Sequence, residues 1–277
     1  METLSSPGAA ERFGLVDSHA HLDMEAFARD RDEVVARAFQ AGLESVLCPA
    51  ELTEERSAAV VLDLVRRHPR LLAAAGVHPH RAALYGRAAE DALRRLAAGG
   101  EIRAVGEIGL DFHYNLSPPS DQSRAFRAQL GLAAELRLPV ILHSRDAGPE
   151  VLDAVREANL SRGGVLHCFT ESWPIAARAL DLGLHISFSG ILTFPGATDL
   201  RETARRIPDG RLLVETDAPY LAPVPYRGKG RRNEPAWVVE TARLLAGLRN
   251  VPFEELADAT TRTYCGLFGF EKSRTGC

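Results

Sequence analysis

Cysteine is scarce in the 277-residue sequence, and no two of its four cysteines form a CxxC pair. The sequence therefore predicts neither a disulfide framework nor a thiolate zinc site. A run of about 18 apolar residues, which a membrane-spanning helix needs, is also missing. The first residues lack the basic start and the apolar middle of a secretion signal. We therefore expect no membrane span and a location in the cytoplasm.

Lysine is nearly absent, since Lys229 and Lys272 are the only two, and the formal net charge is -4. A negative net charge argues against a general coating of nucleic acid or a role at a membrane surface. A polyanionic substrate would have to be met by a local basic patch. The 45% of hydrophobic residues is ordinary for a globular domain with a substantial core.

Short apolar runs alternate with longer stretches of helical period, which indicates βαβ units around a parallel sheet. We count eight such runs, at residues 13–16, 45–50, 71–77, 102–108, 139–143, 163–167, 184–190 and 211–217. Eight units predict an α/β fold of the TIM (β/α)8 barrel type, with an open doubly wound sheet as the alternative. We expect a flexible N-terminal tail at 1–11, one barrel domain at 12–270 that includes a closing helix at 252–269, and a C-terminal tail at 271–277.

Histidines and carboxylates gather where the predicted strands end, and barrel enzymes carry their active sites at the C-terminal ends of the strands. Alternation along extended backbone places His19 and His21 on one side of the chain. The full set of candidate metal ligands is His19, His21, Glu107, His143, His167 and Asp217. Six ligands exceed the four that one structural zinc takes, so two ions are expected, and Glu107 is the only candidate for a bridging carboxylate. A bridging carbamylated lysine is excluded, since neither lysine follows a mid-barrel strand.

Eight sequence blocks resemble the signatures of the TatD-type metal-dependent hydrolases and DNases. In order along the chain they are DSHAHLD, GVHPH, GEIGLDF, ILHSRDA, LHCFTES, SFSG, ETDAPYLAP and RGK…RNEPAWV. The resemblance implies a TIM-barrel metallohydrolase that cleaves phosphoester bonds, typically in DNA. It implies that His19, His21 and Asp217 hold one ion, that His143 and His167 hold the other, and that Glu107 bridges them. The segment RGKGRRNEP departs from the family pattern by two additional residues, which leaves the substrate preference open.

The expected catalytic residues are Asp217 and Glu107. Two divalent ions, of magnesium, manganese or zinc, can activate a shared water for in-line attack on phosphorus. We expect Asp217 to orient this water and to take its proton, and Glu107 to bridge the ions. The expected reaction is exonucleolytic cleavage of DNA, and the polarity of attack and a preference for RNA or a small phosphoester are left open.

Two further residues near strand ends are candidates for substrate binding. His78 could contact a phosphate or make a structural hydrogen bond. Arg145 could clamp a phosphate, because a guanidinium contacts two oxygens at once, or it could form a surface ion pair with Asp146. We expect His80 to occupy only a surface or turn position and Cys168 to face the core.

The segment at 225–232 carries four cations in eight residues on an otherwise acidic protein. Within it, Arg227 and Lys229 could attract a polyanion, and Tyr226 could stack on a base. The alternative is a solvated loop that neutralises Glu234 and its neighbours.

Two other functions fit parts of this pattern. A barrel amidohydrolase that cleaves a carbon–nitrogen or aminoacyl ester bond also uses HxH, two later histidines and an aspartate. A metal-binding module without catalysis would be expected to lose a ligand, yet all six are present. We expect DNA or another phosphoester as the partner and no obligate protein partner.

Overall fold

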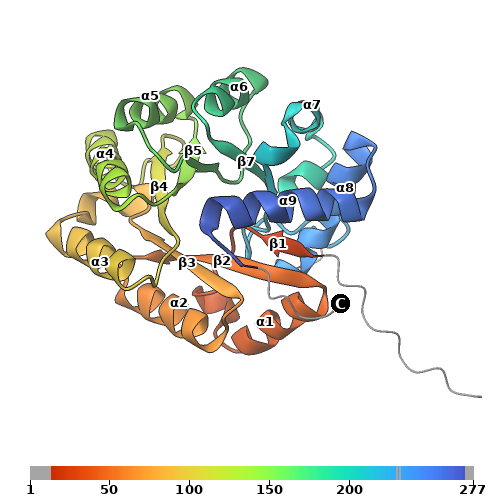
Figure 1. Cartoon of the computed structure of the whole chain (residues 1–277), viewed down its shortest axis with the longest axis horizontal. Coiled ribbons are helices and arrows are strands. Elements are labelled where there is room, and N and C mark those ends of the chain that lie inside the picture. Colours follow the sequence, from red (N-terminus) through yellow and green to blue (C-terminus); the bar gives the residue numbers. More distant parts are fainter. Residues whose placement is uncertain (1–13, 229, 231, 272–277) are drawn as a thin grey trace, which may run out of the picture.

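Eight parallel strands pair in sequence order, from β1 to β8, and helices surround them (Figure 1). The computed structural model describes residues 14–228, 230 and 232–271. The strands are β1 Leu15–Asp17, β2 Leu43–Glu51, β3 Leu71–Gly76, β4 Ala104–Asp111, β5 Val140–Arg145, β6 Gly164–Leu166, β7 His185–Phe188 and β8 Leu212–Val214. This order confirms the predicted (β/α)8 barrel. The alternative of a doubly wound sheet is wrong, because that fold orders its strands out of sequence.

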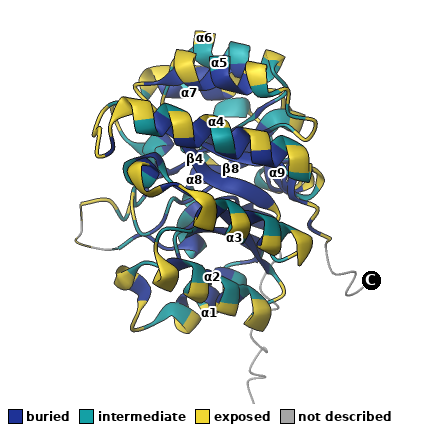
Figure 2. Cartoon of the chain, turned by 90° about the vertical axis from the view of Figure 1, so that its left-hand side faces the viewer, coloured by how far each residue is buried: buried dark blue, intermediate teal, exposed yellow. Residues whose placement is uncertain are grey.

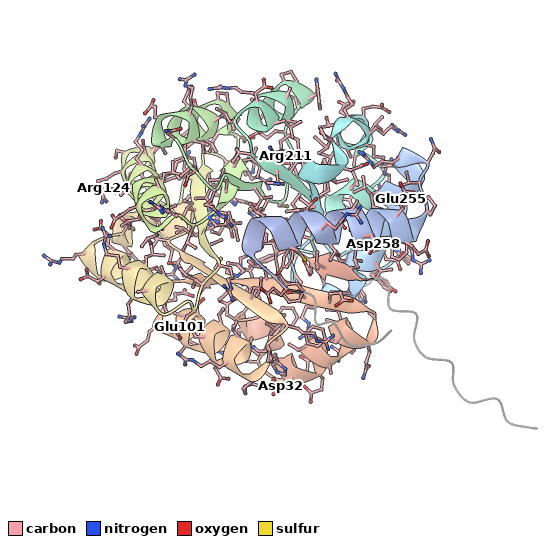
Figure 3. The ribbon with its side chains drawn as sticks, in the orientation of Figure 1. Asp32, Glu101, Arg124, Arg211, Glu255 and Asp258 are labelled. Carbon is pink, nitrogen blue, oxygen red and sulfur yellow. The ribbon has the colours of Figure 1, made fainter. Side chains whose placement is uncertain are left out.

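The helices form a ring outside the strands. They are α1 Arg31–Gln40, α2 Glu55–Arg67, α3 Arg87–Ala98, α4 Pro119–Leu136, α5 Gly148–Ala158, α6 Trp173–Asp181, α7 Thr198–Arg206, α8 Val238–Arg249 and α9 Phe253–Phe268. Their buried faces turn inward and their exposed faces outward (Figure 2). Charged side chains such as Asp32, Arg124 and Glu255 lie on the outer surface of this ring (Figure 3). The inward apolar stripe of each amphipathic helix thus covers the sheet.

Backbone contacts between the first and last strands close the barrel. The amide of Ser18 donates to the carbonyl of Val214 at 3.1 Å, and the amide of Asp217 donates to the carbonyl of His19 at 2.9 Å. Ala20 and Ala218 form a parallel bridge. The HxH segment and the Asp217 segment are therefore held side by side although almost 200 residues separate them.

Helix α9 closes the end of the barrel at which the strands begin. Its residues Tyr264, Leu267 and Phe268 pack against a cluster of buried residues that includes Val16 of β1 and Leu47 of β2. The Tyr264 hydroxyl lies 2.9 Å from that of Ser45. With this end filled, the C-terminal ends of the strands are left for the site. The helix predicted at 252–269 is confirmed.

The predicted N-terminal tail lies outside the described residues, as does the C-terminal tail from residue 272 onward. The proposed division into tails and one domain stays a prediction. Among the described helices, none combines the length and the apolar character that crossing a bilayer requires.

Candidate metal centre

A β-bulge in β4 places Glu107 at the centre of the barrel mouth. Val105 pairs with Val140 and Ile108 with Leu142, so β4 contains one more residue than β5 over this stretch. Such an extra residue bends a strand and redirects a side chain. The Glu107 side chain is buried, with 6% of its surface exposed. A carboxylate in this position needs partners, because an unpaired buried charge costs several kcal/mol or more.

Three imidazoles surround one oxygen of Glu107. Oε1 lies 2.7 Å from His143 Nδ1, 2.8 Å from His167 Nε2 and 3.2 Å from His78 Nε2. These histidines come from the ends of three strands or the loops that follow them, β5, β6 and β3. The fold therefore brings His78 into the same cluster as the predicted ligands, and its contact with a phosphate stays a prediction.

Two more imidazoles lie on the other oxygen. Oε2 of Glu107 is 3.3 Å from His19 Nε2 and 3.6 Å from His21 Nε2. Asp217 Oδ1 lies 3.4 Å from the same atom of His21 and 4.0 Å from that of His19. The two Nε2 atoms face each other at 3.2 Å, so both cannot carry a proton toward the other.

The charges in this cluster shift its pKa values in opposite directions. Burial opposes ionisation of Glu107, yet His167 and His78 hold its pKa well below the usual range. Burial lowers the pKa of His78 to about 4. Despite burial, the hydrogen bond that His21 donates to Asp217 and the charge of Glu107 raise the pKa of His21 to about 9. A divalent cation would compete with the protons on the raised imidazoles, so its affinity would increase with pH.

The donor set fits divalent metal ions. Three groups of ligand atoms each lie within 4.8 Å of one another: His19 with His21 and Asp217, His19 with Glu107 and His167, and His78 with Glu107 and His143. Imidazole and carboxylate together suit zinc, manganese and similar ions. His19, His21 and Asp217 would together hold one such cation, which would satisfy the two facing Nε2 atoms and the Asp217 oxygen.

Two buried carboxylates contact the candidate ligands His167 and His143 at the ring nitrogen that does not face Glu107. Glu215 Oε1 accepts from the amide of Cys168 at 2.6 Å and lies 3.2 Å from His167 Nδ1. Asp111 Oδ2 lies 3.2 Å from His143 Nε2 and 2.7 Å from His80 Nε2. Outer partners of this kind fix the ring orientation of a metal-ligating histidine.

No role was predicted for Glu215. Its position two residues before Asp217, on the same predicted strand, could have indicated that it belongs to the site. His80 was expected only at a surface or turn position, and this is wrong, because its ring bonds Asp111 and lines the cavity. Cys168 was expected in the core but also lines the cavity. It follows the end of β6 with φ of 44°, so strand alternation no longer applies to it.

A cavity of about 570 Å³ opens above the metal-ligand groups. Arg145 lines it, and the guanidinium lies 5.5 Å from the centre of the Tyr114 ring. The alternative ion pair between Arg145 and Asp146 is absent from the described residues. Asp146 instead lies 3.0 Å from His113. Arg145 is therefore available to a ligand in this cavity.

The predicted basic loop makes contacts away from the cavity. The Tyr226 ring stacks on Trp237 with 4.1 Å between centroids, and the Arg227 guanidinium lies 4.0 Å from the centre of the Phe194 ring. Neither residue lines the cavity. Lys229 lies outside the described residues.

The loop was also considered as a neutralising partner for Glu234. Within the described part of the loop this is wrong, because Glu234 pairs with Arg37 of α1 at 2.7 Å. Arg232 pairs with Asp30 instead, at 2.8 Å. These two ion pairs anchor the end of the loop to the segment around α1.

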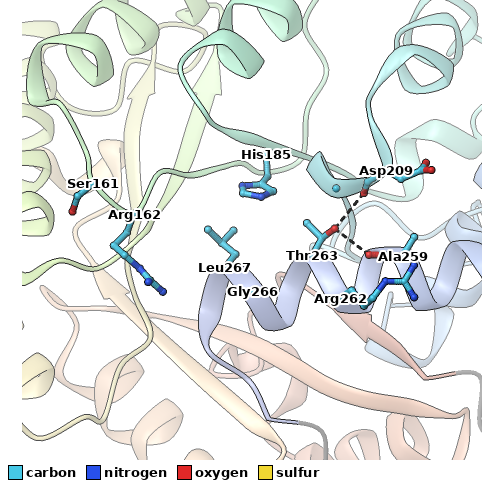
Figure 4. A pocket seen from close by; sticks show the side chains of 10 residues that line it. Ser161, Arg162, His185, Asp209, Ala259, Arg262, Thr263, Gly266 and Leu267 are labelled. Carbon is cyan, nitrogen blue, oxygen red and sulfur yellow. Dashed lines mark hydrogen bonds between the residues drawn. The ribbon is translucent and has the colours of Figure 1, made fainter.

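A second cavity, of about 470 Å³, lies beside α9 at the N-terminal ends of the strands (Figure 4). Arg162 and His185 line it on one side, and Thr263 and Leu267 of α9 on the other. The Thr263 hydroxyl donates to the carbonyl of Asp209 at 3.2 Å. This cavity contains none of the metal-ligand groups and is separated from them by the packed interior of the barrel.

Residues 16–269 match the protein family described as TatD related DNase. The chain is 44% identical over 265 residues to the uncharacterized metal-dependent hydrolase YcfH of Escherichia coli K12, which covers 94% of this chain and 97% of that one. It is 41% identical over 256 residues to the 3'-5' ssDNA/RNA exonuclease TatD of Salmonella typhimurium, and the match covers 90% of this chain and 98% of that one. The solved structure of YjjV, a TatD homologue from Escherichia coli K12, superposes with a TM-score of 0.86 at 32% identity, covering 93% and 98%.

Proposed function

The chain belongs to the TatD-related DNase family and is a metal-dependent hydrolase, and we propose that it shortens single-stranded DNA from the 3′ end. The observation that carries the proposal is the convergence of five imidazoles on Glu107 at the floor of an open cavity. The curated relatives named 3'-5' ssDNA/RNA exonuclease supply the class of substrate and the polarity. A cytoplasmic location stays a prediction.

We assign two divalent ions to this centre. His19, His21 and Asp217 would hold one, and His143 and His167 the other, with Glu107 between them. When bound, such ions lower the pKa of a water toward neutrality and neutralise phosphoryl oxygens. The proximity of His78 to Glu107 makes it a further candidate ligand or a contact for a phosphate oxygen. Magnesium, manganese and zinc are all compatible with these donors.

The side chains themselves supply orientation and proton transfer. Asp217 lines the cavity beside His21, where a carboxylate oxygen can take a proton from the attacking water. Glu215 and Asp111 hold the rings of His167 and His143 in place. Arg145 lies at the cavity wall, where a guanidinium can bind two oxygens of a phosphate. Tyr226, Arg227 and Lys229 remain candidate contacts only for a longer substrate.

The test uses metal-stripped protein and single-stranded DNA labelled at either end, with magnesium, manganese or zinc added in turn. We expect metal-dependent shortening in which the 3′ label is lost first. The Asp217→Asn variant should bind metal but show no shortening. If no ion supports cleavage, the nuclease proposal fails. Release of an amine from a cyclic amide by the same protein would then identify the carbon–nitrogen hydrolase alternative.

A further inference from the structure

The mouth of the barrel is electrostatically asymmetric. In a barrel of eight strands in sequence order, the loop after β1 lies opposite the loop after β5. Asp23 follows β1 and Glu51 ends β2, whereas Arg145 ends β5 and Tyr114 follows β4. All four residues line the cavity. The β1–β2 side of the cavity, here called the acidic wall, therefore carries two carboxylates. The β4–β5 side, here called the cationic wall, carries a guanidinium and an exposed ring beside the buried carboxylate of Asp111.

The cationic wall has the chemistry of a nucleotide site. Tyr114 is one of the few large exposed rings, with 57% of its surface accessible, and His80 meets it edge to face at 5.7 Å between centroids. Arg145 is exposed, and within the described chain no carboxylate pairs with it. An exposed ring beside an uncompensated guanidinium suits a base and the adjoining backbone phosphate.

The acidic wall has the opposite character. Glu51 is largely buried, and its oxygens accept from the amides of His78 and Thr53, at 2.8 and 2.9 Å. Asp23 accepts a hydrogen bond from Ser57 at 2.7 Å. These partners are neutral donors, and among the described residues neither carboxylate forms an ion pair, although the charge of Arg81 acts on Glu51. A phosphate placed against this wall would meet like charge in a poorly solvated position.

We propose that an unpaired nucleic-acid strand enters over the β4–β5 side, with a base on Tyr114 and a phosphate at Arg145, and that its terminal nucleoside ends against the Asp23–Glu51 wall. This inference rests on the proposed function and assigns a direction to it. The scissile phosphate lies at the metal-ligand groups between the two walls. A strand that continued past this point would place its next phosphate on the carboxylates, so the site favours a free terminal hydroxyl.

Glu54 offers a way to alter the acidic wall without touching a candidate metal ligand. It also lines the cavity, is half-exposed, and pairs with Arg81, which belongs to the same wall. Glu54→Gln removes one negative charge and releases Arg81 from its partner. The wall should then tolerate a terminal phosphate better than before.

The first experiment separates strand binding from chemistry by comparing two phosphodiesters. One is an unpaired oligodeoxynucleotide, and the other is bis(4-nitrophenyl) phosphate, which has neither a base nor a second phosphate. Tyr114→Leu should raise KM for the oligonucleotide about tenfold, the scale of one base–aromatic stack, and Tyr114→Phe should restore it. Arg145→Gln should raise KM similarly. Arg162→Gln, which removes the same charge at the other end of the barrel, is the matched control.

The small diester has no base for Tyr114 and no second phosphate for Arg145, so these variants should change its KM by a smaller factor than they change the KM of the oligonucleotide. If KM rises by the same factor for both substrates, or does not change for the oligonucleotide, the assignment of Tyr114 and Arg145 to strand binding is overturned. A wild-type protein that hydrolyses only the small diester would instead refute the nuclease function itself, which keeps the two failures distinct.

The second experiment compares oligonucleotides that end in a 3′ hydroxyl or a 3′ phosphate. The wild type should degrade the phosphorylated end more slowly, and Glu54→Gln should narrow that difference. Equal wild-type rates on both ends would show that the acidic wall does not contact the terminus. If Glu54→Gln leaves the ratio of the rates on the 3′ hydroxyl and 3′ phosphate ends unchanged, the electrostatic explanation is refuted.

Discussion

Replacement of Glu107 by glutamine tests whether one carboxylate organises the whole metal centre. Both oxygens of Glu107 face imidazole nitrogens, at 2.7 and 2.8 Å on one side and 3.3 Å on the other. The glutamine side chain keeps the shape but has no charge and only one acceptor oxygen. It therefore cannot bridge two cations, and we expect metal binding to weaken strongly.

The loss of metal-induced stability in Glu107→Gln can be worked out from the linkage between metal binding and folding. One ion present at 100 times its dissociation constant stabilises the folded chain by about 2.7 kcal/mol. Mutation of residues that merely orient ligands costs about 10–100-fold in affinity, so loss of a bridging ligand should cost at least about 100-fold. The remaining stabilisation is then about 0.4 kcal/mol. At about 2–4 °C per kcal/mol, the metal-induced rise in Tm falls from about 5–11 °C to about 1–2 °C.

The assay is thermal unfolding with and without added metal, for the wild type and for Glu107→Gln. The quantity compared is the shift in Tm on metal addition, because the metal-free variants differ in stability for other reasons. Glu135→Gln, an exposed substitution at an ion pair with Arg94, provides a control that should keep the full shift. A Glu107→Gln protein with the full shift would refute the bridging role.

Three further substitutions have defined outcomes. Asp217→Asn should lower kcat at least about 100-fold, the usual contribution of a positioned base, and a rate near that of the wild type would refute its role in proton transfer. Glu215→Gln should weaken metal affinity about 10–100-fold by releasing His167, as measured by metal titration. The hydrogen bond from Arg232 lowers the pKa of Asp30 from 3.8 to about 2. The ionised form therefore stabilises the fold above about pH 4, and this contribution is lost as the pH falls toward 2. Asp30→Asn should lower the free energy of unfolding by less than about 1 kcal/mol at neutral pH, because the ion pair is partly exposed. Denaturant unfolding should show that this difference from the wild type vanishes near pH 2.

The strands and their order could be predicted because each one is a short apolar run between helical stretches. Parallel strands buried on both faces require such runs, and this requirement is local. The same argument located the functional residues, since His143 and His167 end or follow apolar runs in a barrel whose sites lie at strand ends.

The geometry around Glu107 could not be predicted, because it depends on contacts between distant segments. The bulge in β4 follows from its register against β5, which no single segment reveals. His80 looked like a turn residue because its partner, Asp111, lies 31 positions further along the chain. Tyr226 looked available for stacking until the fold placed Trp237 against its ring.

The most direct test of the two-ion hydrolase is the dependence of DNA shortening on the number of bound ions. Metal-stripped protein is loaded with increasing manganese, and bound metal per chain is measured together with the rate on single-stranded DNA. We expect a rate that rises with metal occupancy and reaches a plateau at about two ions per chain. Full activity in the metal-free protein, or two bound ions without any cleavage, would contradict it.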